Sequence, residues 1–128
     1  MTEKDYYAKI NRYYVAHIEE YQNNIVWEAK FSRTKRIAYR SLALHQEASL
    51  LQAERYFAHK LADVGIALKP FDGFVLYKAT VFFIAIYFSE KTEIYEIPIR
   101  LLLREKYLSG EKSLTKERAK EIGKLIKL

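Results

Sequence analysis

Hydrophobic and polar positions follow two periods along the chain, one helical and one extended. Near the N-terminus, mostly aromatic residues recur at the spacing of one helix face and predict a helix over 5–21; they are Tyr6, Tyr7, Ile10, Tyr13, Tyr14, His17, Ile18 and Tyr21. The apolar run 25–31 comes next and predicts a strand. A second helix is expected over 41–63, with Ser41 as its N-cap.

The second half of the chain is expected to supply most of the sheet. Aromatic and β-branched residues over 74–77 and 81–88 predict two central strands. Alternation over 95–101 predicts a half-buried strand, which Pro98 assigns to a sheet edge. Thr115 is expected to cap a last helix over 116–127. The order helix, strand, helix, three strands and helix predicts a single α/β domain over 1–128, with a mixed central sheet flanked by helices.

Composition and charge narrow the function classes. The 128 residues include no cysteine, so disulfides and thiolate metal sites are excluded, and a metal would need oxygen ligands or one of the three histidines. A net charge of +6 favours a polyanionic partner. The N-terminus lacks an apolar signal core, and the uninterrupted apolar run 79–88 is too short to span a bilayer. We therefore expect a soluble cytoplasmic protein with no membrane partner.

The strand over 25–31 contains an acid and a lysine two residues apart. Side chains alternate between the faces of a strand, so Glu28 and Lys30 point the same way. A carboxylate can hold a hard cation that polarises a phosphodiester, and a lysine beside it can stabilise developing negative charge. This grouping suits metal-dependent phosphodiester hydrolysis. The structural alternative is an ion pair within one strand at the border of the sheet.

Two further carboxylates are candidates for a shared metal site. Asp72 lies in the sequence Pro-Phe-Asp-Gly before an apolar strand, and its structural alternative is a turn residue before glycine. Glu20 lies at the end of the first predicted helix, where it is otherwise an ordinary border charge. His45 and Gln46 begin the second predicted helix, near the end of the preceding strand if the crossover is right-handed. There Gln46 is suited to hold a water or a phosphate.

A basic segment follows the candidate strand. It contains five cations and no acid: Lys30, Arg33, Lys35, Arg36 and Arg40. Two interpretations are open for this segment. It is either a solvated basic loop or a phosphate-binding surface directly beside the site.

Together, these segments resemble the PD-(D/E)xK nuclease superfamily, and within it the RecU-type and phage Holliday junction resolvases. The likeness is found in residues 25–31, His45-Gln46, 69–74 and 113–123. The resemblance implies a restriction-endonuclease-like core, Mg²⁺ or Mn²⁺ as cofactor, and a homodimer that cuts branched DNA in recombination. It implies that Glu28 is a metal ligand and Lys30 the catalytic lysine.

The order of the motifs departs from that family. There the proline-acid element precedes the Glu-x-Lys strand, whereas here Asp72 follows it, and 83–87 contains nothing ionisable. Either the Glu-x-Lys pair has moved to a neighbouring strand while Asp72 supplies the first carboxylate, or Glu20 supplies it, or the site only binds DNA. We favour the first. The leading hypothesis is a Mg²⁺-dependent DNA endonuclease; the alternatives are a non-catalytic nucleic-acid-binding domain using the 30–40 loop, and an assembly protein that docks an acidic partner.

Overall fold

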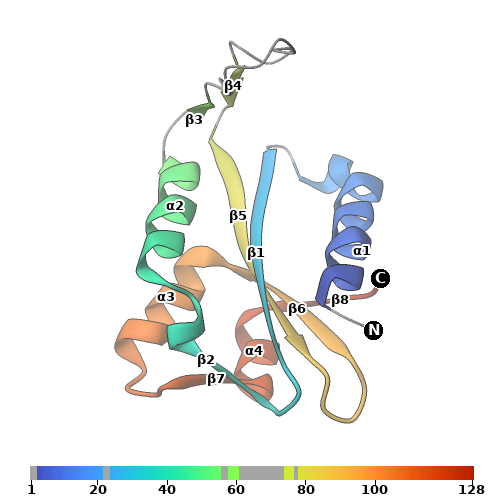
Figure 1. The fold of residues 1–128 in the computed structure, drawn as a ribbon, viewed down its shortest axis with the longest axis vertical. Helices are drawn as coiled ribbons and strands as arrows, with labels where there is room; N and C mark the ends of the chain where they lie inside the picture. Colours follow the sequence, from blue (N-terminus) through green and yellow to red (C-terminus); the bar gives the residue numbers. More distant parts are fainter. Residues whose placement is uncertain (1–2, 22–23, 56–57, 61–73, 77) are drawn as a thin grey trace.

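The computed structural model describes residues 3–21, 24–55, 58–60, 74–76 and 78–128 (Figure 1). Helices and strands follow one another in this order: α1 (Glu3–Ala16), the 3-10 helix η1 (Ile18–Glu20), β1 (Asn24–Ser32), β2 (Arg36–Ala38), the 3-10 helix η2 (Tyr39–Ser41), α2 (Leu44–Arg55), β3 (Ala58–Lys60), β4 (Phe74–Leu76), β5 (Ala79–Tyr87), β6 (Glu93–Pro98), α3 (Ile99–Leu108), β7 (Ser113–Thr115), α4 (Lys116–Ile122) and β8 (Lys124–Ile126).

The central sheet has four strands in the order β1-β5-β6-β8. β1 runs parallel to β5, with Glu28 opposite Phe83 and Lys30 opposite Ala85. β6 runs antiparallel to both β5 and β8. A parallel pair needs a long crossover connection, and α2 lies within the one between β1 and β5. The predicted single α/β domain with a mixed sheet flanked by helices is confirmed.

Helices cover the sheet on both faces (Figure 1). On one face, α1 packs against Phe82, Ile84 and Ile86 of β5. On the other face, the alternate residues of β5 pack in one cluster with residues of α2, α3, α4, β2 and β7. Every residue of β5 from 81 to 87 is buried, because both of its faces are covered. No helix in the part of the chain that the structure describes is long and apolar enough to cross a membrane.

Several predicted boundaries are confirmed and others are wrong. The strand over 25–31 is β1, and Thr115 caps α4 by accepting the Arg118 amide at 3.1 Å. Ser41 is not the cap of α2, which begins at Leu44; the Ser41 hydroxyl instead donates to the Ala38 carbonyl at 2.6 Å within η2. α2 ends at Arg55, and 58–60 is a strand rather than helix.

The last part of the chain differs most from its predicted structure. β6 ends at Pro98, and 99–101 belongs to α3 rather than to a strand. β6 also lies between β5 and β8 rather than at the edge; Pro98 is its last residue and the N-cap of α3, where a missing N–H removes no helical bond. α4 ends at Ile122. A Cβ on Gly123 would lie 2.7 Å from the Ile97 side chain, so glycine allows the close turn into the unpredicted β8.

Candidate active site

Glu28 and Lys30 lie on the face of the sheet that α2 covers. Their neighbours Trp27 and Ala29 pack in the cluster under α1, so the alternate residues point to the other side. Lys30 Nζ lies 3.2 Å from Glu28 Oε1. The side chains are 22% and 31% exposed, because β1 is at the edge of the sheet. The pair is therefore neither sealed in the core nor fully solvated.

Gln46 is the third member of this cluster. Its Nε2 donates to Glu28 Oε1 at 2.9 Å, and its own Oε1 accepts the Ala43 backbone N–H at 3.0 Å. The second contact satisfies a free amide at the start of α2, as the glutamine of a capping box does. Gln46 is thus fixed between a helix terminus and the middle of β1, where it positions Glu28. Its neighbour His45 is exposed.

The structure brings together three of the four predicted catalytic residues: Glu28, Lys30 and Gln46. Both contacts to Glu28 are made by Oε1, and Oε2 has no partner among the described residues. Hard cations bind such carboxylate oxygens, and Mg²⁺ in particular is often held by one or two carboxylates together with water and substrate phosphate. Glu28 fits one position of such a site.

The predicted second carboxylate, Asp72 or Glu20, is not found beside Glu28 within the described residues. In 3–21, 24–55, 58–60, 74–76 and 78–128, no group of three or more His, Asp or Glu side chains converges as metal ligands would. Asp72 lies outside the described residues. Glu20 is exposed in η1, and the adjacent Tyr21 donates to Glu96 on the α1 face of the sheet. The structure therefore places Glu20 on the side of the sheet opposite to Glu28 and does not bring the two together.

The basic segment after β1 contains a short turn that leads into a second strand, rather than one continuous loop. β1 extends to Ser32, and β2 begins at Arg36 and pairs with β7. Between them, Thr34 Oγ1 accepts the Arg36 amide at 3.2 Å, and the Lys116 amide donates to the Lys35 carbonyl at 2.9 Å. These bonds hold the turn against the start of α4.

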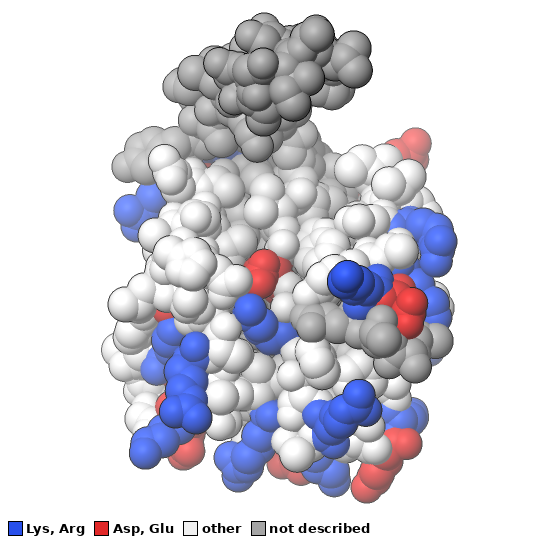
Figure 2. All heavy atoms as spheres, viewed as in Figure 1, with Lys and Arg blue, Asp and Glu red and all other residues white. Residues whose placement is uncertain are grey.

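The five predicted cations do not form one continuous surface. Lys30 pairs with Glu28, Arg33 lies over the Phe88 ring at 5.9 Å, and Lys35 lies 3.6 Å from the exposed Glu90. Lys35 and Arg36 line one hollow, whereas Arg40 lines another. Figure 2 shows basic side chains gathered toward the end of the molecule that carries β2 and β7, with a largely uncharged area above them.

A buried carboxylate under α1 was not predicted. Glu96 is 5% exposed, and its Oε2 accepts hydrogen bonds from the hydroxyls of Tyr14 and Tyr21, each at 2.7 Å. Burial, together with the hydrogen bond to Glu96, raises the pKa of Tyr14 well above its usual range. Glu96 is one of the polar residues that alternate with apolar residues along this strand. Such alternation predicts that its side chain faces solvent. α1 covers that face and buries it.

A second buried cluster joins α2 to α3. Glu47 is 6% exposed and contacts Lys106 Nζ and the Tyr107 hydroxyl, the latter at 2.6 Å. Lys106 Nζ also donates to the Leu42 carbonyl at 3.1 Å. Sequence periodicity did not reveal this cluster, because both partners of Glu47 lie on a helix that was predicted in part as strand.

No protein-family model, curated protein or solved structure matches this chain. The geometry of the site is therefore the basis for inferring function.

Proposed function

We propose that this protein is a Mg²⁺- or Mn²⁺-dependent DNA endonuclease of the PD-(D/E)xK type that acts on branched DNA, as a Holliday junction resolvase does. The observation behind this proposal is the convergence of Lys30 and Gln46 on a single oxygen of Glu28. A partly exposed ion pair contributes little to stability, so stability alone gives little reason to fix three side chains at the edge of a sheet. A functional site that needs a positioned carboxylate explains why these three side chains are held together.

In the proposed mechanism, Glu28 Oε2 holds the cation, and Asp72 supplies the second carboxylate. When bound, the cation polarises the scissile phosphate and lowers the pKa of a water molecule. Lys30 places a positive charge beside the phosphate and stabilises the negative charge that develops on its oxygens. Gln46 keeps Glu28 oriented, since its amide is itself fixed by the start of α2.

The charge of the protein supports a nucleic-acid substrate. Its net charge is +6, and five cations follow or belong to the strand that carries Glu28. Phosphate contacts from lysine and arginine supply most of the sequence-independent affinity for DNA. The proposed assembly is a homodimer, because resolving a four-way junction requires two cuts and a two-fold dimer presents two identical sites.

A second candidate function is a non-catalytic nucleic-acid-binding domain. It is favoured by one observation: the described residues contain no group of three or more His, Asp or Glu side chains that could hold a metal ion. A domain of this kind would bind DNA through the same lysine and arginine side chains. It would not bind a metal ion and would not cleave the DNA.

Cleavage of a labelled four-way junction in Mg²⁺ separates the two candidates, and Lys30→Ala tests the centre of the site. We expect this variant to lose at least about a hundredfold in cleavage rate, because it removes one preorganised charge from the reacting phosphate. Lys124→Ala is the matched control, since Lys124 is exposed on β8 on the α1 side of the sheet. If Lys30→Ala cleaves like the wild type, the Glu28–Lys30 pair is structural.

Thermal melts with and without Mg²⁺ identify the carboxylates that hold the cation. Mg²⁺ should raise the melting temperature of the wild type, and Glu28→Gln and Asp72→Asn should abolish that increase. Glu20→Gln should retain it, because Glu20 lies on the other side of the sheet. If Glu20→Gln loses the increase and Asp72→Asn keeps it, Glu20 is the second ligand. A wild type that neither responds to Mg²⁺ nor cleaves leaves the binding domain as the function.

A further inference from the structure

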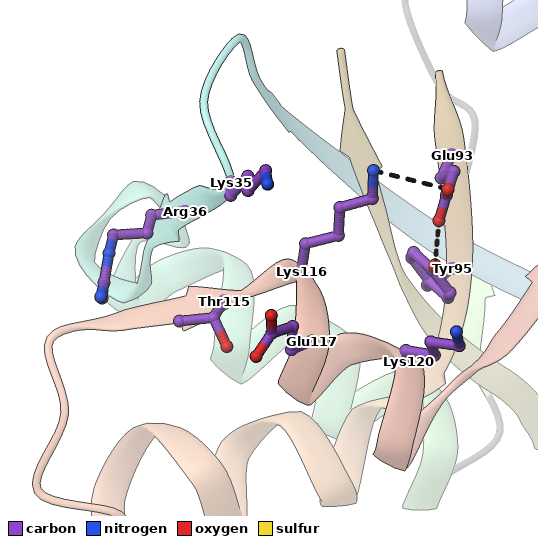
Figure 3. Close-up of a pocket in the computed structure, with 8 residues that line it drawn as sticks. All are labelled: Lys35, Arg36, Glu93, Tyr95, Thr115, Lys116, Glu117 and Lys120. Carbon is purple, nitrogen blue, oxygen red and sulfur yellow. Dashed lines mark hydrogen bonds and ion pairs between the residues drawn. The ribbon is translucent and has the colours of Figure 1, made fainter. Parts of the chain in front are cut away.

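A basic hollow lies beyond the end of β1, between the β1–β2 turn, β6 and α4. It has a volume of about 440 Å³ and is lined mainly by charged side chains: Lys35, Arg36, Glu93, Tyr95, Thr115, Lys116, Glu117 and Lys120. These residues come from three separate parts of the sequence. Figure 3 shows Lys116 reaching across the hollow to Glu93, with Lys120 one turn further along α4.

The hollow opens on the same face of the sheet as the proposed active site. Tyr95 belongs to the buried cluster on the α2 side, and Glu93 is two residues away on the same strand, so both point to that side. α4, which contributes Lys116 and Lys120, packs in the same cluster through Ala119. Glu28 and Lys30 also point to this side of the sheet. The two places therefore lie on the same side of the sheet.

The hollow has an excess of positive charge. Its lining contains four cations, Lys35, Arg36, Lys116 and Lys120, against two carboxylates, Glu93 and Glu117. Lys116 is engaged, because its Nζ lies 3.5 Å from Glu93 Oε1 and 3.4 Å from Ser89 Oγ. The Lys35 ammonium lies 3.6 Å from a carboxylate oxygen of the exposed Glu90, and such a pair contributes little. Lys120 has no acidic partner within the part of the chain that the structure describes.

Glu93 is held at the floor of the hollow by two donors. The hydroxyl of Tyr95 and the ammonium of Lys116 both contact its carboxylate, and mainly the hydrogen bond from Tyr95 lowers the pKa of Glu93. Glu93 in turn holds Lys116, whose side chain is only 15% exposed. These contacts fix Lys116 within the hollow and leave Lys35 and Lys120 among the cations that no carboxylate of the lining engages.

We propose that this hollow binds the phosphate backbone of DNA, through Lys35 and Lys120, on the path that leads to Glu28 and Lys30. This inference rests on the proposed nuclease function and adds α4 to the DNA-binding surface. Lys30 and Lys35 are five residues apart, so their Cα atoms are at most about 17 Å apart. Each strand of B-DNA advances about 3.4 Å per nucleotide along the helix axis, so a strand with one phosphate at Lys30 has another near Lys35 within about five nucleotides.

Arg40 is not part of the basic hollow. It lies beyond β2 and lines a different hollow, together with Lys106 and Lys112. Arg36 stands at the rim of the basic hollow, and Figure 3 shows its side chain extending away from Lys116. The cations that are consecutive in sequence are therefore expected to contribute unequally to DNA binding.

Two double variants of equal net charge test the proposal. Lys35→Ala/Lys120→Ala removes two cations from the hollow, and Arg12→Ala/Lys124→Ala removes two exposed cations on the α1 side of the sheet, so both lower the net charge from +6 to +4. Binding of a labelled four-way junction is measured by fluorescence anisotropy in EDTA at several salt concentrations. The first variant should flatten the slope of log affinity against log salt by up to about two and weaken binding about tenfold or more. The second should change both much less.

Neutral methylphosphonate linkages locate the contact on the DNA. One linkage at a time is placed along each arm of the junction, and those facing the hollow should weaken binding to the wild type. The same linkages should no longer matter in Lys35→Ala/Lys120→Ala, because the partners of those phosphates are gone.

The outcomes separate this inference from the proposed function. If the two double variants bind DNA alike while Lys30→Ala abolishes cleavage, the hollow is not a DNA site and the nuclease function stands. If the wild type binds no DNA, both fail together. If Lys35→Ala/Lys120→Ala keeps the wild-type salt slope but loses binding to a phosphoserine peptide, the hollow belongs to a protein partner and the proposal is overturned.

Discussion

Glu28 and Glu96 lie on opposite faces of the central sheet, and each uses one carboxylate oxygen to accept two partners. Glu28 Oε1 contacts Lys30 and Gln46, and Glu96 Oε2 contacts the hydroxyls of Tyr14 and Tyr21. The first side chain is 31% exposed, whereas Glu96 is only 5% exposed. The first group is partly open to solvent at a sheet edge, and the second is enclosed beneath a helix.

The difference follows from the place of each strand in the sheet. β6 has a strand on either side and α1 over one face, so its carboxylate has to be satisfied by donors within the fold. β1 is an edge strand, and Glu28 keeps one oxygen without a partner among the described residues. The same chemical group therefore ties layers together under α1 and stays partly exposed on β1. Three predictions test this contrast.

Replacing the enclosed carboxylate should have the largest effect. Glu96→Ala removes the acceptor of the buried Tyr14 hydroxyl and of the partly buried Tyr21 hydroxyl, and a buried unsatisfied group costs about 1–3 kcal/mol, so the free energy of unfolding should fall by about 3 kcal/mol. Glu28→Ala should cost about 1 kcal/mol or less, since its pair is partly exposed. Urea unfolding measures both.

Glu96→Gln is the control for the first prediction, because it keeps an acceptor oxygen for the tyrosines and should be clearly less destabilising than Glu96→Ala. Equal losses from Glu96→Ala and Glu28→Ala would mean that both carboxylates are structural, and the contrast between the two faces would be lost.

An intermediate effect is expected from the residue that positions Glu28. Gln46→Ala should reduce the rate of junction cleavage about tenfold, because groups that orient a metal-binding carboxylate typically contribute 10–100-fold to activity. The free energy of unfolding should fall by no more than about 1 kcal/mol, the scale of a lost helix cap. Gln52→Ala, an exposed change on the same helix, should do neither. Unchanged cleavage in Gln46→Ala would mean that Gln46 serves only as a helix cap and that its contact with Glu28 has no role in catalysis.

The smallest effect should come from replacing Glu93. It has a tyrosine hydroxyl as a partner, as Glu96 has, and a lysine, as Glu28 has. Its pKa is lowered from the usual 4.5 in the folded protein, mainly by Tyr95. A lowered pKa stabilises the folded state above the unfolded value, and the stabilisation disappears as the pH falls through the folded pKa. The free energy of unfolding should therefore change less between pH 6 and pH 3 in Glu93→Gln than it does in the wild type. An unchanged difference would show that these contacts do not favour the charged form.

Local sequence pattern was enough to identify the strand and the pair that define the candidate site. Alternation has a period of two, so Glu28 and Lys30 share a face whatever packs around them. The mixed α/β architecture and the Thr115 cap were also predictable, because they depend on patterns spanning a few neighbouring residues.

The remaining features depend on contacts between distant parts of the chain. Gln46 meets Glu28 because α2 begins at Leu44 rather than at Ser41, and no local signal set that boundary. Glu96 was expected in solvent, yet α1, which begins more than seventy residues earlier, covers it. Lys35 and Lys120 share a hollow because β2 pairs with β7 and brings α4 to the β1–β2 turn. A sequence pattern reports which side of its own element a residue faces, whereas only packing decides what covers that side.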